Sequence, residues 1–274
     1  MHNAAVGSGV HSAFPFCDLA AQYPGALSAG SELSGTPPGP FASKLAARRH
    51  NPFVPKVRPF AVVARDPDVT LDVLALALAA EFRDVDAASA MARLDVLGAK
   101  LSRAAEQTNG TPEAHALACG QVIGAAHGFV GDREHYDDPG NSMLDLVLTR
   151  RRGLPILLSV VYVEVARRAG IKIAGVGLPG HFIVGHFGTD PPVLLDPFAG
   201  GSRVQTDAAP ELVRPWRADE VAMRILNNLV LAYDRRGDVG AAIQAARLRL
   251  ALPAEASHRD MLHAQLRAIQ ARLN

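Results

Sequence analysis

The chain has 274 residues, enough for one large domain or two small ones. Apolar residues make up 49% of the sequence and charged residues 20%, a balance typical of a globular protein with a hydrophobic core. The formal net charge is +1 and aromatic residues make up 5%. Neither value favours nucleic acid or an anionic membrane as a partner.

The cysteines and the apolar runs indicate where the protein works. The two cysteines, Cys17 and Cys119, lie in different contexts, which argues against a disulfide and excludes a zinc site built from cysteines. The longest apolar runs, 73–80 and 154–163, are shorter than the roughly 20 residues of a membrane-spanning helix. The N-terminus has neither a basic cluster nor a sustained apolar run. We therefore expect a cytoplasmic protein that does not bind membranes.

The first 58 residues differ from the rest of the chain. They are rich in Gly, Ser, Pro and Ala, most densely in the segment 30–40, and carry a short basic patch at 44–50. Such a stretch buries too little apolar surface to offset the entropy cost of ordering it. We predict a disordered tail over residues 1–58, and a tail without function is favoured over a binding tail.

From residue 67 the spacing of apolar residues becomes helical. In the first predicted helix, one face carries the apolar residues Leu71, Leu74, Leu78 and Phe82. Asp68 or Thr70 can cap that helix. A second helix is predicted over Asp86 to Gln107, with Leu94, Leu97 and Leu101 facing inward. A third starts with Thr111 as the cap and Pro112 as the first helical residue.

A polar loop over 131–140 separates these helices from two more. Asn141 or Ser142 is predicted to cap a helix that carries Leu144, Leu146 and Leu148. Gly153, Leu154 and Pro155 then break the pattern. A strongly apolar helix follows to residue 169, and Gly170 is its natural stop.

After Gly170 the sequence becomes strand-like. Short β-type runs at 171–176, 182–187 and 193–195 are separated by turn-forming segments. Helices followed by a small antiparallel sheet indicate the α+β class. From residue 218 helices return, and two short ones joined at Gly237 resemble one tetratricopeptide-type hairpin. A lone repeat has no copy to stack on, so we expect it to pack on the main domain.

The order of elements over 153–200 is that of a thiol-dependent acyl-transfer site. Such a site has a thiol at the N-terminus of a buried helix, a histidine on a neighbouring strand and an acid on the next. Here the helix starts at Pro155, His181 begins a strand and Asp196 ends the following one. A hairpin turning at 188–192 would bring His181 and Asp196 together.

These segments resemble a known family. Residues 153–159 and 166–170 resemble the core helix of transglutaminases, with Pro155 at the cysteine position, and His181 and Asp196 match the family histidine and aspartate. The variant is similar to the SirB-type branch of the transglutaminase-like superfamily. The motifs that carry this resemblance are DPGNS at 138–142, RGLP at 152–155, LPGHF at 178–182 and DPF at 196–198. In that branch a proline at this position is usual.

The resemblance covers roughly residues 60–265. It implies a papain- or transglutaminase-like core over 59–217, including a helical front, and a tetratricopeptide-like hairpin over 218–274. No cofactor and no metal site are expected.

Each candidate residue also has a structural interpretation. Pro155 has no ionisable atom and suits the first turn of a helix. Ser159, one turn later, is a substitute nucleophile or, as we favour, a small packing residue. Cys119 fits a buried apolar role better than a displaced thiol. His181 and Asp196 fit a retained site and a structural pair about equally well. His186 should face the other side of the sheet, which argues against a metal-binding pair with His181.

Two charged segments are left open. The cluster 134–138 could line the same cleft or bind a cation, although a solvated loop is the commoner outcome. The run 150–152 of three arginines could hold an acidic ligand, or it could be a solvated helix end that suits the helix dipole.

Two functions follow. The first is a catalytically degenerate core that binds a protein or peptide partner or regulates one. The alternative is an active hydrolase or amide-transferase that uses His181 and Asp196 with a nucleophile other than cysteine, such as Ser159 or a water. A structural subunit of a larger complex is a third, weaker class.

Overall fold

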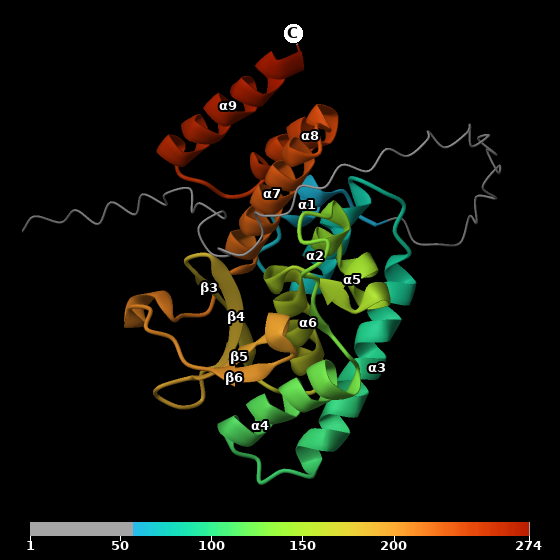
Figure 1. The fold of residues 1–274 in the computed structure, drawn as a ribbon, viewed down its shortest axis with the longest axis vertical. Coiled ribbons are helices and arrows are strands. Elements are labelled where there is room, and N and C mark those ends of the chain that lie inside the picture. Colours follow the sequence, from blue (N-terminus) through green and yellow to red (C-terminus); the bar gives the residue numbers. More distant parts are fainter. Residues whose placement is uncertain (1–56, 274) are drawn as a thin grey trace, which may run out of the picture. The chain divides into compact units, whose positions relative to one another are not determined.

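The computed structural model describes residues 57–273 (Figure 1). The predicted tail over residues 1–58 therefore lies outside the described residues except for its last two. Of these, Val57 is half-buried against the core, and Arg58 is 3.8 Å from the Asp66 carboxylate. None of the helices within 57–273 combines the length and the apolar character needed to cross a bilayer.

The fold belongs to the predicted α+β class, and it begins with a helical front. The front comprises α1 (Phe60–Val63), α2 (Leu71–Ala80), α3 (Ala87–Glu106), α4 (Pro112–Cys119) and the π-helix η2 (Gly120–Ala126). Local signals set the starts of α3 and α4. Asp86 accepts a hydrogen bond from the Ser89 N–H, and Thr111, the predicted cap of α4, accepts one from the Ala114 N–H. Thr70 precedes α2, but its hydroxyl donates to Asp72 instead of capping the helix.

The next segment corrects one prediction. Neither Asn141 nor Ser142 caps a helix, because both lie inside the 3₁₀ turn η3 (Pro139–Ser142). The turn is capped by Asp138, which accepts the Gly140 N–H. Helix α5 (Leu144–Arg150) begins only after the turn, and its last turn closes on Arg151 in the left-handed conformation. The polar side chains of η3 are therefore buried.

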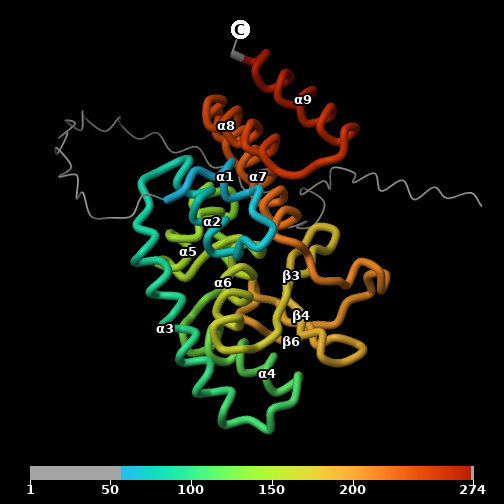
Figure 2. Tube along the Cα trace, turned by 180° about the vertical axis from the view of Figure 1, so that it is seen from behind, coloured from blue at the N-terminus to red at the C-terminus, as the bar shows by residue number. Residues whose placement is uncertain are grey.

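Helix α6 (Pro155–Arg168) is the centre of the domain. Figures 1 and 2 show it between the sheet on one side and α2 and α3 on the other. Every residue from 155 to 162 is buried, which explains why this segment is apolar all round. Close packing against α3 requires Gly98, since a β-carbon there would lie 2.5 Å from Cβ of Arg168.

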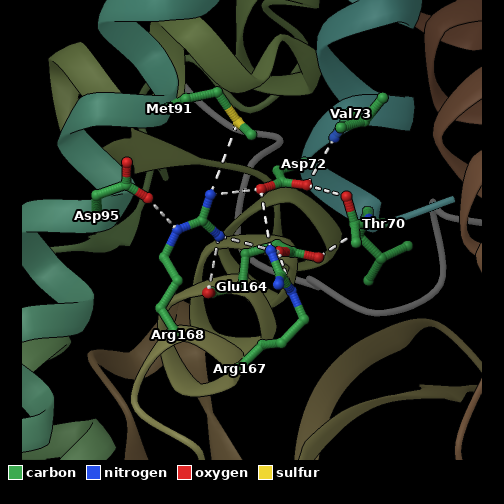
Figure 3. Close-up of polar contacts among 9 residues, drawn as sticks. Thr70, Asp72, Val73, Met91, Asp95, Glu164, Arg167 and Arg168 are labelled. Carbon is green, nitrogen blue, oxygen red and sulfur yellow. Dashed lines mark hydrogen bonds and ion pairs between the residues drawn. The ribbon is translucent and has the colours of Figure 1, made fainter.

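Polar contacts fix the C-terminal half of α6 to the helical front (Figure 3). Asp72 on α2 and Glu164 on α6 are both buried, and Arg168 bridges them. Its Nη2 is 2.6 Å from the Asp72 carboxylate and its Nη1 is 3.0 Å from that of Glu164. Glu164 also accepts the Leu71 N–H, and Arg168 Nε donates to Asp95 on α3. One cluster thus joins three helices.

The sheet is antiparallel, with the strand order β3-β4-β5-β6. Its strands are β3 (Ile173–Leu178), β4 (His181–His186), β5 (Val193–Asp196) and β6 (Ser202–Val204). The first three were predicted, although β3 extends to Leu178, so that only Pro179 and Gly180 form the turn. Strand β6 was not predicted. A separate two-stranded parallel pair joins β1 (Val130–Gly131) to β2 (Arg152–Gly153).

The two faces of the sheet differ. Phe182, Val184 and Leu195 belong to the main core, which also contains α6. On the opposite face, a smaller cluster contains Val176, Leu178, Ile183 and Leu194. The short turn η4 (Pro197–Ala199) connects β5 to β6, and the turn η5 (Pro210–Leu212) follows β6.

Three helices follow, α7 (Ala218–Arg235), α8 (Val239–Arg249) and α9 (Ala256–Gln270), and then the turn η6 (Ala271–Leu273). Helix α7 places Val221, Leu226 and Leu229 in the main core. The turn to α8 uses Gly237 in the left-handed conformation, and Asp238 caps α8. In α9, Leu262 and Leu266 are the buried residues, and the helix lies against α8 (Figure 1).

Candidate functional site

The sheet brings His181 and Asp196 together. His181 begins β4 and Asp196 ends the antiparallel neighbour β5, so both lie at the same end of these two central strands. His181 Nε2 is 3.0 Å from Oδ2 of Asp196. The histidine side chain is 32% exposed and the aspartate 15%, so the imidazole is the more accessible partner.

The surroundings of Asp196 favour its ionised form. Burial alone would raise the pKa of the Asp196 carboxyl, but the hydrogen bond and the charge from His181 oppose it. The backbone N–H groups of Phe198 and Ala199 act in the same direction, and the pKa is held below its ordinary value. When the imidazole is neutral, this bond keeps its proton on Nε2 and leaves Nδ1 as an acceptor.

His181 borders an open hollow of about 430 Å³. The residues that line it are Leu178, Pro179, His181, Ile183, Val204, Gln205, Thr206 and Ala208. The walls are mostly apolar, and His181, Gln205 and Thr206 supply polar groups. A volume of this size lies within the range of ligand pockets, roughly 300–1,000 Å³. The arrangement can therefore receive a side chain and exchange a hydrogen bond with it.

Arg224 on α7 supports the turn that carries His181. Its guanidinium donates to the carbonyl oxygens of Leu178 and His181, at 3.1 and 3.3 Å. It also lies over the rings of Phe182 and Trp216, which are in edge-to-face contact. The sequence does not predict this contact, because more than 40 residues separate Arg224 from the turn and no local pattern marks it.

The start of α6 holds no nucleophile. Pro155 is the first helical residue and is buried, and no side chain caps the helix. Ser159 is buried, and its hydroxyl has no hydrogen-bond partner, so it is not bonded to His181. Cys119 is also buried, and its burial raises the pKa of the thiol to about 12. A thiol with such a pKa is not a nucleophile near neutral pH.

The turn η3 adjoins this helix start. The Leu154 N–H, just before α6, donates to the Asn141 carbonyl oxygen. The Asn141 side chain is buried, and its Nδ2 donates to Asp132 and to the His135 carbonyl. Its Oδ1 and the hydroxyl of Ser142 are buried without partners.

The remaining candidates lie apart from this site. His186 faces the other side of the sheet, where its ring centroid is 6.3 Å from that of His115, and burial lowers its pKa. His181 and His186 therefore do not form a pair. Within residues 57–273, no group of three or more His, Cys, Asp or Glu side chains is positioned to hold a metal ion.

The acidic loop and the arginine run contact each other. Asp138 accepts a hydrogen bond from Arg150 at 2.8 Å, and Asp137 pairs with Arg235 of α7. Glu134 and His135 are exposed. The two aspartates therefore tie the loop to α5 and α7. Arg151 and Arg152 are exposed beyond the end of α5.

Comparison with known proteins identifies the class. Residues 88–227, just over half of the chain, match the family model of the transglutaminase-like superfamily, and the chain belongs to that superfamily. The match begins in α3 and ends in α7, so it is narrower than the segment 60–265 that the motifs suggested. No solved structure matches the chain.

The relatives add little about activity. The chain is similar to a UPF0162 protein of Xylella fastidiosa (strain 9a5c), 45% identical over 34% of each chain. It is also similar to the UPF0162 protein PA3419 of Pseudomonas aeruginosa, 32% identical over 43% of this chain and 48% of that one. F-box only protein 21 of Mus musculus is 41% identical over 20% of this chain and 9% of that one. The matches thus span a third to a half of the bacterial relatives and a small part of the mouse protein.

Proposed function

We propose that this protein is a transglutaminase-like protein of the SirB type whose site is catalytically degenerate and binds a protein or peptide. One observation carries the proposal. A proline begins α6 where the family has its cysteine, while His181 remains 3.0 Å from Asp196 beside an open hollow. The groups that assist a nucleophile are kept, and the nucleophile is absent.

The other hydroxyl and thiol candidates in the core support binding over acyl transfer. Ser159 is buried and makes no hydrogen bond, so no base activates it. Cys119 has its pKa raised to about 12 and lies beyond the reach of solvent. Neither fits the requirement for a nucleophile within hydrogen-bond reach of its base.

The hollow suits an extended peptide. Strand β6 is the last strand in the sheet order, and its Val204 lines the hollow beside Gln205 and Thr206. A peptide that pairs with a sheet edge gains main-chain hydrogen bonds and places alternate side chains in neighbouring pockets. One such side chain would enter the hollow, where its polar end would meet His181.

The C-terminal helices fit a partner-binding role. Helices α7 and α8, joined at Gly237, form a hairpin that we interpret as tetratricopeptide-like, and we propose domain limits of 59–217 and 218–274. The proposed location is the cytoplasm, since Cys119 is a free thiol and no helix in 57–273 fits a membrane span.

The test is peptide selection followed by affinity measurement on the full chain. Extended peptides selected from a displayed library should bind wild type, and Ala208→Trp, which fills the hollow, should abolish binding. His181→Ala should weaken it by about tenfold, the loss expected for one charge-assisted hydrogen bond. His263→Ala, an exposed histidine on α9, is the matched control and should leave binding unchanged. Peptides that bind Ala208→Trp as well as wild type would contradict the proposed site.

A second experiment tests the geometry at the start of α6. In a Cys17→Ser background, Pro155→Cys would place a thiol at a helix N-terminus, where the dipole lowers its pKa. We expect iodoacetamide to alkylate it faster than Cys119, and His181→Ala to slow that reaction. A rate that does not depend on His181 would mean that the helix start and the histidine do not form one site.

The alternative is an active hydrolase or amide-transferase. It is favoured by the ionised Asp196, which orients an accessible imidazole beside an open hollow. A water would then have to be the nucleophile, with His181 as its base. Turnover of a peptide amide that His181→Ala abolishes would support this alternative and refute the degenerate site. Absence of such turnover in a protein that binds peptides would support the first proposal.

A further inference from the structure

A second hollow lies among α3, the end of η2 and the end of α5. Its volume is about 340 Å³. The residues that line it are Ser89, Ala92, Arg93, Val96, Leu97, Lys100, His127, Phe129, Leu148 and Arg151. The floor is apolar, since Leu97, Phe129 and Leu148 are all buried side chains. Val96 at its side is 56% exposed and adds apolar surface beside the hollow.

The rim of this hollow is basic. Arg93, Lys100 and Arg151 supply three cations, and no acidic side chain is among the lining residues. Arg93 and Arg151 are exposed and make no ion pair with any residue in 57–273. The acid on this part of α3, Asp95, is engaged elsewhere, because it accepts a hydrogen bond from Arg168 at 2.6 Å. The positive charge of the rim is therefore not neutralised within the fold.

Lys100 is held in place without a counter-charge. Its Nζ is 2.9 Å from Nε2 of His127, and Nδ1 of His127 is 2.6 Å from the carbonyl oxygen of Val122. A carbonyl oxygen can only accept, so Nδ1 carries the proton and Nε2 accepts from the ammonium group. This contact orders the lysine at the rim but leaves its full charge available.

Arg151 provides an independent observation. Its backbone has φ 57°, a left-handed conformation that glycine or asparagine adopts most easily at a helix C-terminus. The turn needs that conformation, because the Arg151 N–H donates to Val147 and its carbonyl accepts the Val130 N–H. The turn does not need the side chain, which makes no hydrogen bond or ion pair with any residue in 57–273. An arginine at a strained position therefore points to a use for its guanidinium at the hollow.

We propose that this hollow binds a small amphipathic anion, with an apolar body on the floor and one carboxylate or phosphate group held by Arg93, Lys100 and Arg151. Guanidinium groups suit both head groups, since they can donate two parallel hydrogen bonds to either. This site is distinct from the hollow beside His181. It does not depend on the proposed peptide binding.

Calorimetric titration of the full chain tests the site. The probes are octanoate and octyl phosphate, with 1-octanol as the uncharged control and inorganic phosphate as the control without an apolar body. At least one of the two amphipathic anions should bind more tightly than both controls, and the tighter one identifies the head group. Added salt should weaken the binding, because the contact is electrostatic at an exposed rim.

The variants separate binding from folding. Arg151→Gly should raise the dissociation constant by about tenfold, while its thermal midpoint stays equal to or above that of wild type because the strain is relieved. Arg93→Ala should also weaken binding. Arg152→Ala removes the same charge one residue away, outside the hollow, and should change nothing; His181→Ala should also have no effect. Octanol binding as tightly as the anions, unchanged affinity in Arg151→Gly, or no binding of any probe would each overturn the proposal.

Discussion

The buried polar groups at the two ends of helix α6 differ in whether they have hydrogen-bond or ion-pair partners. At the C-terminal end, Asp72 and Glu164 are almost inaccessible, yet both contact Arg168. Arg167 adds a hydrogen bond to Glu164 at 2.8 Å, and Glu164 also receives the Leu71 N–H. Charges buried in this way are tolerated because they are paired and hydrogen-bonded. The cluster has a structural explanation.

At the N-terminal end, three buried polar atoms lack partners within the described residues. Ser159 Oγ, Asn141 Oδ1 and Ser142 Oγ make no hydrogen bond within the described residues. An unsatisfied buried polar atom costs about 1–3 kcal/mol, so a group of them does not contribute to the stability of the fold. Pairing within the fold therefore explains the buried charges at the C-terminal end. It does not explain the buried hydroxyl and amide oxygens at the N-terminal end. The N-terminal end is the one at which the resemblance to transglutaminases implies the nucleophile position.

The largest expected effect is on stability, from the loss of the ion pairs at the C-terminal end of α6. Arg168→Ala would leave Asp72 and Glu164 buried without their main cation, and it should lower the free energy of unfolding by about 3–5 kcal/mol. Urea denaturation monitored by circular dichroism measures this. Arg103→Ala, an exposed arginine on α3, should change stability by no more than about 0.5 kcal/mol. Equal losses in the two variants would mean that the cluster does not stabilise the fold.

A smaller expected effect at the same end is a dependence of stability on pH. Burial and the neighbouring charge of Asp72 raise the pKa of Glu164 above its ordinary value of 4.5, and the hydrogen bond from Arg167 only partly opposes them. A carboxyl with a raised folded pKa contributes stability that is full below the unfolded pKa and is lost as pH rises through the folded pKa. Relative to Glu164→Gln, wild type should therefore lose stability as pH rises from about 4.5. Urea midpoints measured across that range test the sign, and a difference independent of pH would contradict it.

Asp196, in the candidate site, should make stability depend on pH in the opposite direction from Glu164. Its pKa is lowered below 3.8, because burial is outweighed by the contacts with His181 and the backbone N–H groups together. A carboxyl with a depressed folded pKa contributes stability that is present above the unfolded pKa and is lost as pH falls through the folded one. The stability advantage of wild type over Asp196→Asn should therefore shrink as pH falls below about 4. Asp207→Asn, an exposed carboxylate, provides the control. An advantage that grows on acidification would show that the pair does not hold the aspartate ionised.

Features that depend on nearby residues in the chain can be predicted from the sequence. Asp86 and Thr111 mark the starts of α3 and α4, because a cap acts within three residues of itself. Gly170 marks the end of α6 for the same reason. The meeting of His181 and Asp196 could also be anticipated, since a single hairpin relates them.

The rest depends on distant partners. Asp72 and Arg168 are 96 residues apart, and neither segment signals that its charge is buried. Strand β6 has three residues and exists because β5 offers a partner. Asn141 looks like a helix cap in the sequence, but its amide turns inward to Asp132 and the turn closes on Asp138 instead. Tertiary contacts override the local preference in each case.

The smallest expected effect tests the N-terminal end directly. Ser159→Ala removes a buried hydroxyl that has no partner, at the cost of a very small void. The free energy of unfolding should stay within about 1 kcal/mol of wild type, on the stabilising side. Thr108→Val is the matched control, because the Thr108 hydroxyl donates to the Ala105 carbonyl at 2.8 Å, and it should lose about 1 kcal/mol. If Ser159→Ala is instead the more destabilised variant, the hydroxyl has a partner in solution. The contrast between the two ends of α6 would then fail, because both ends would be explained by stability.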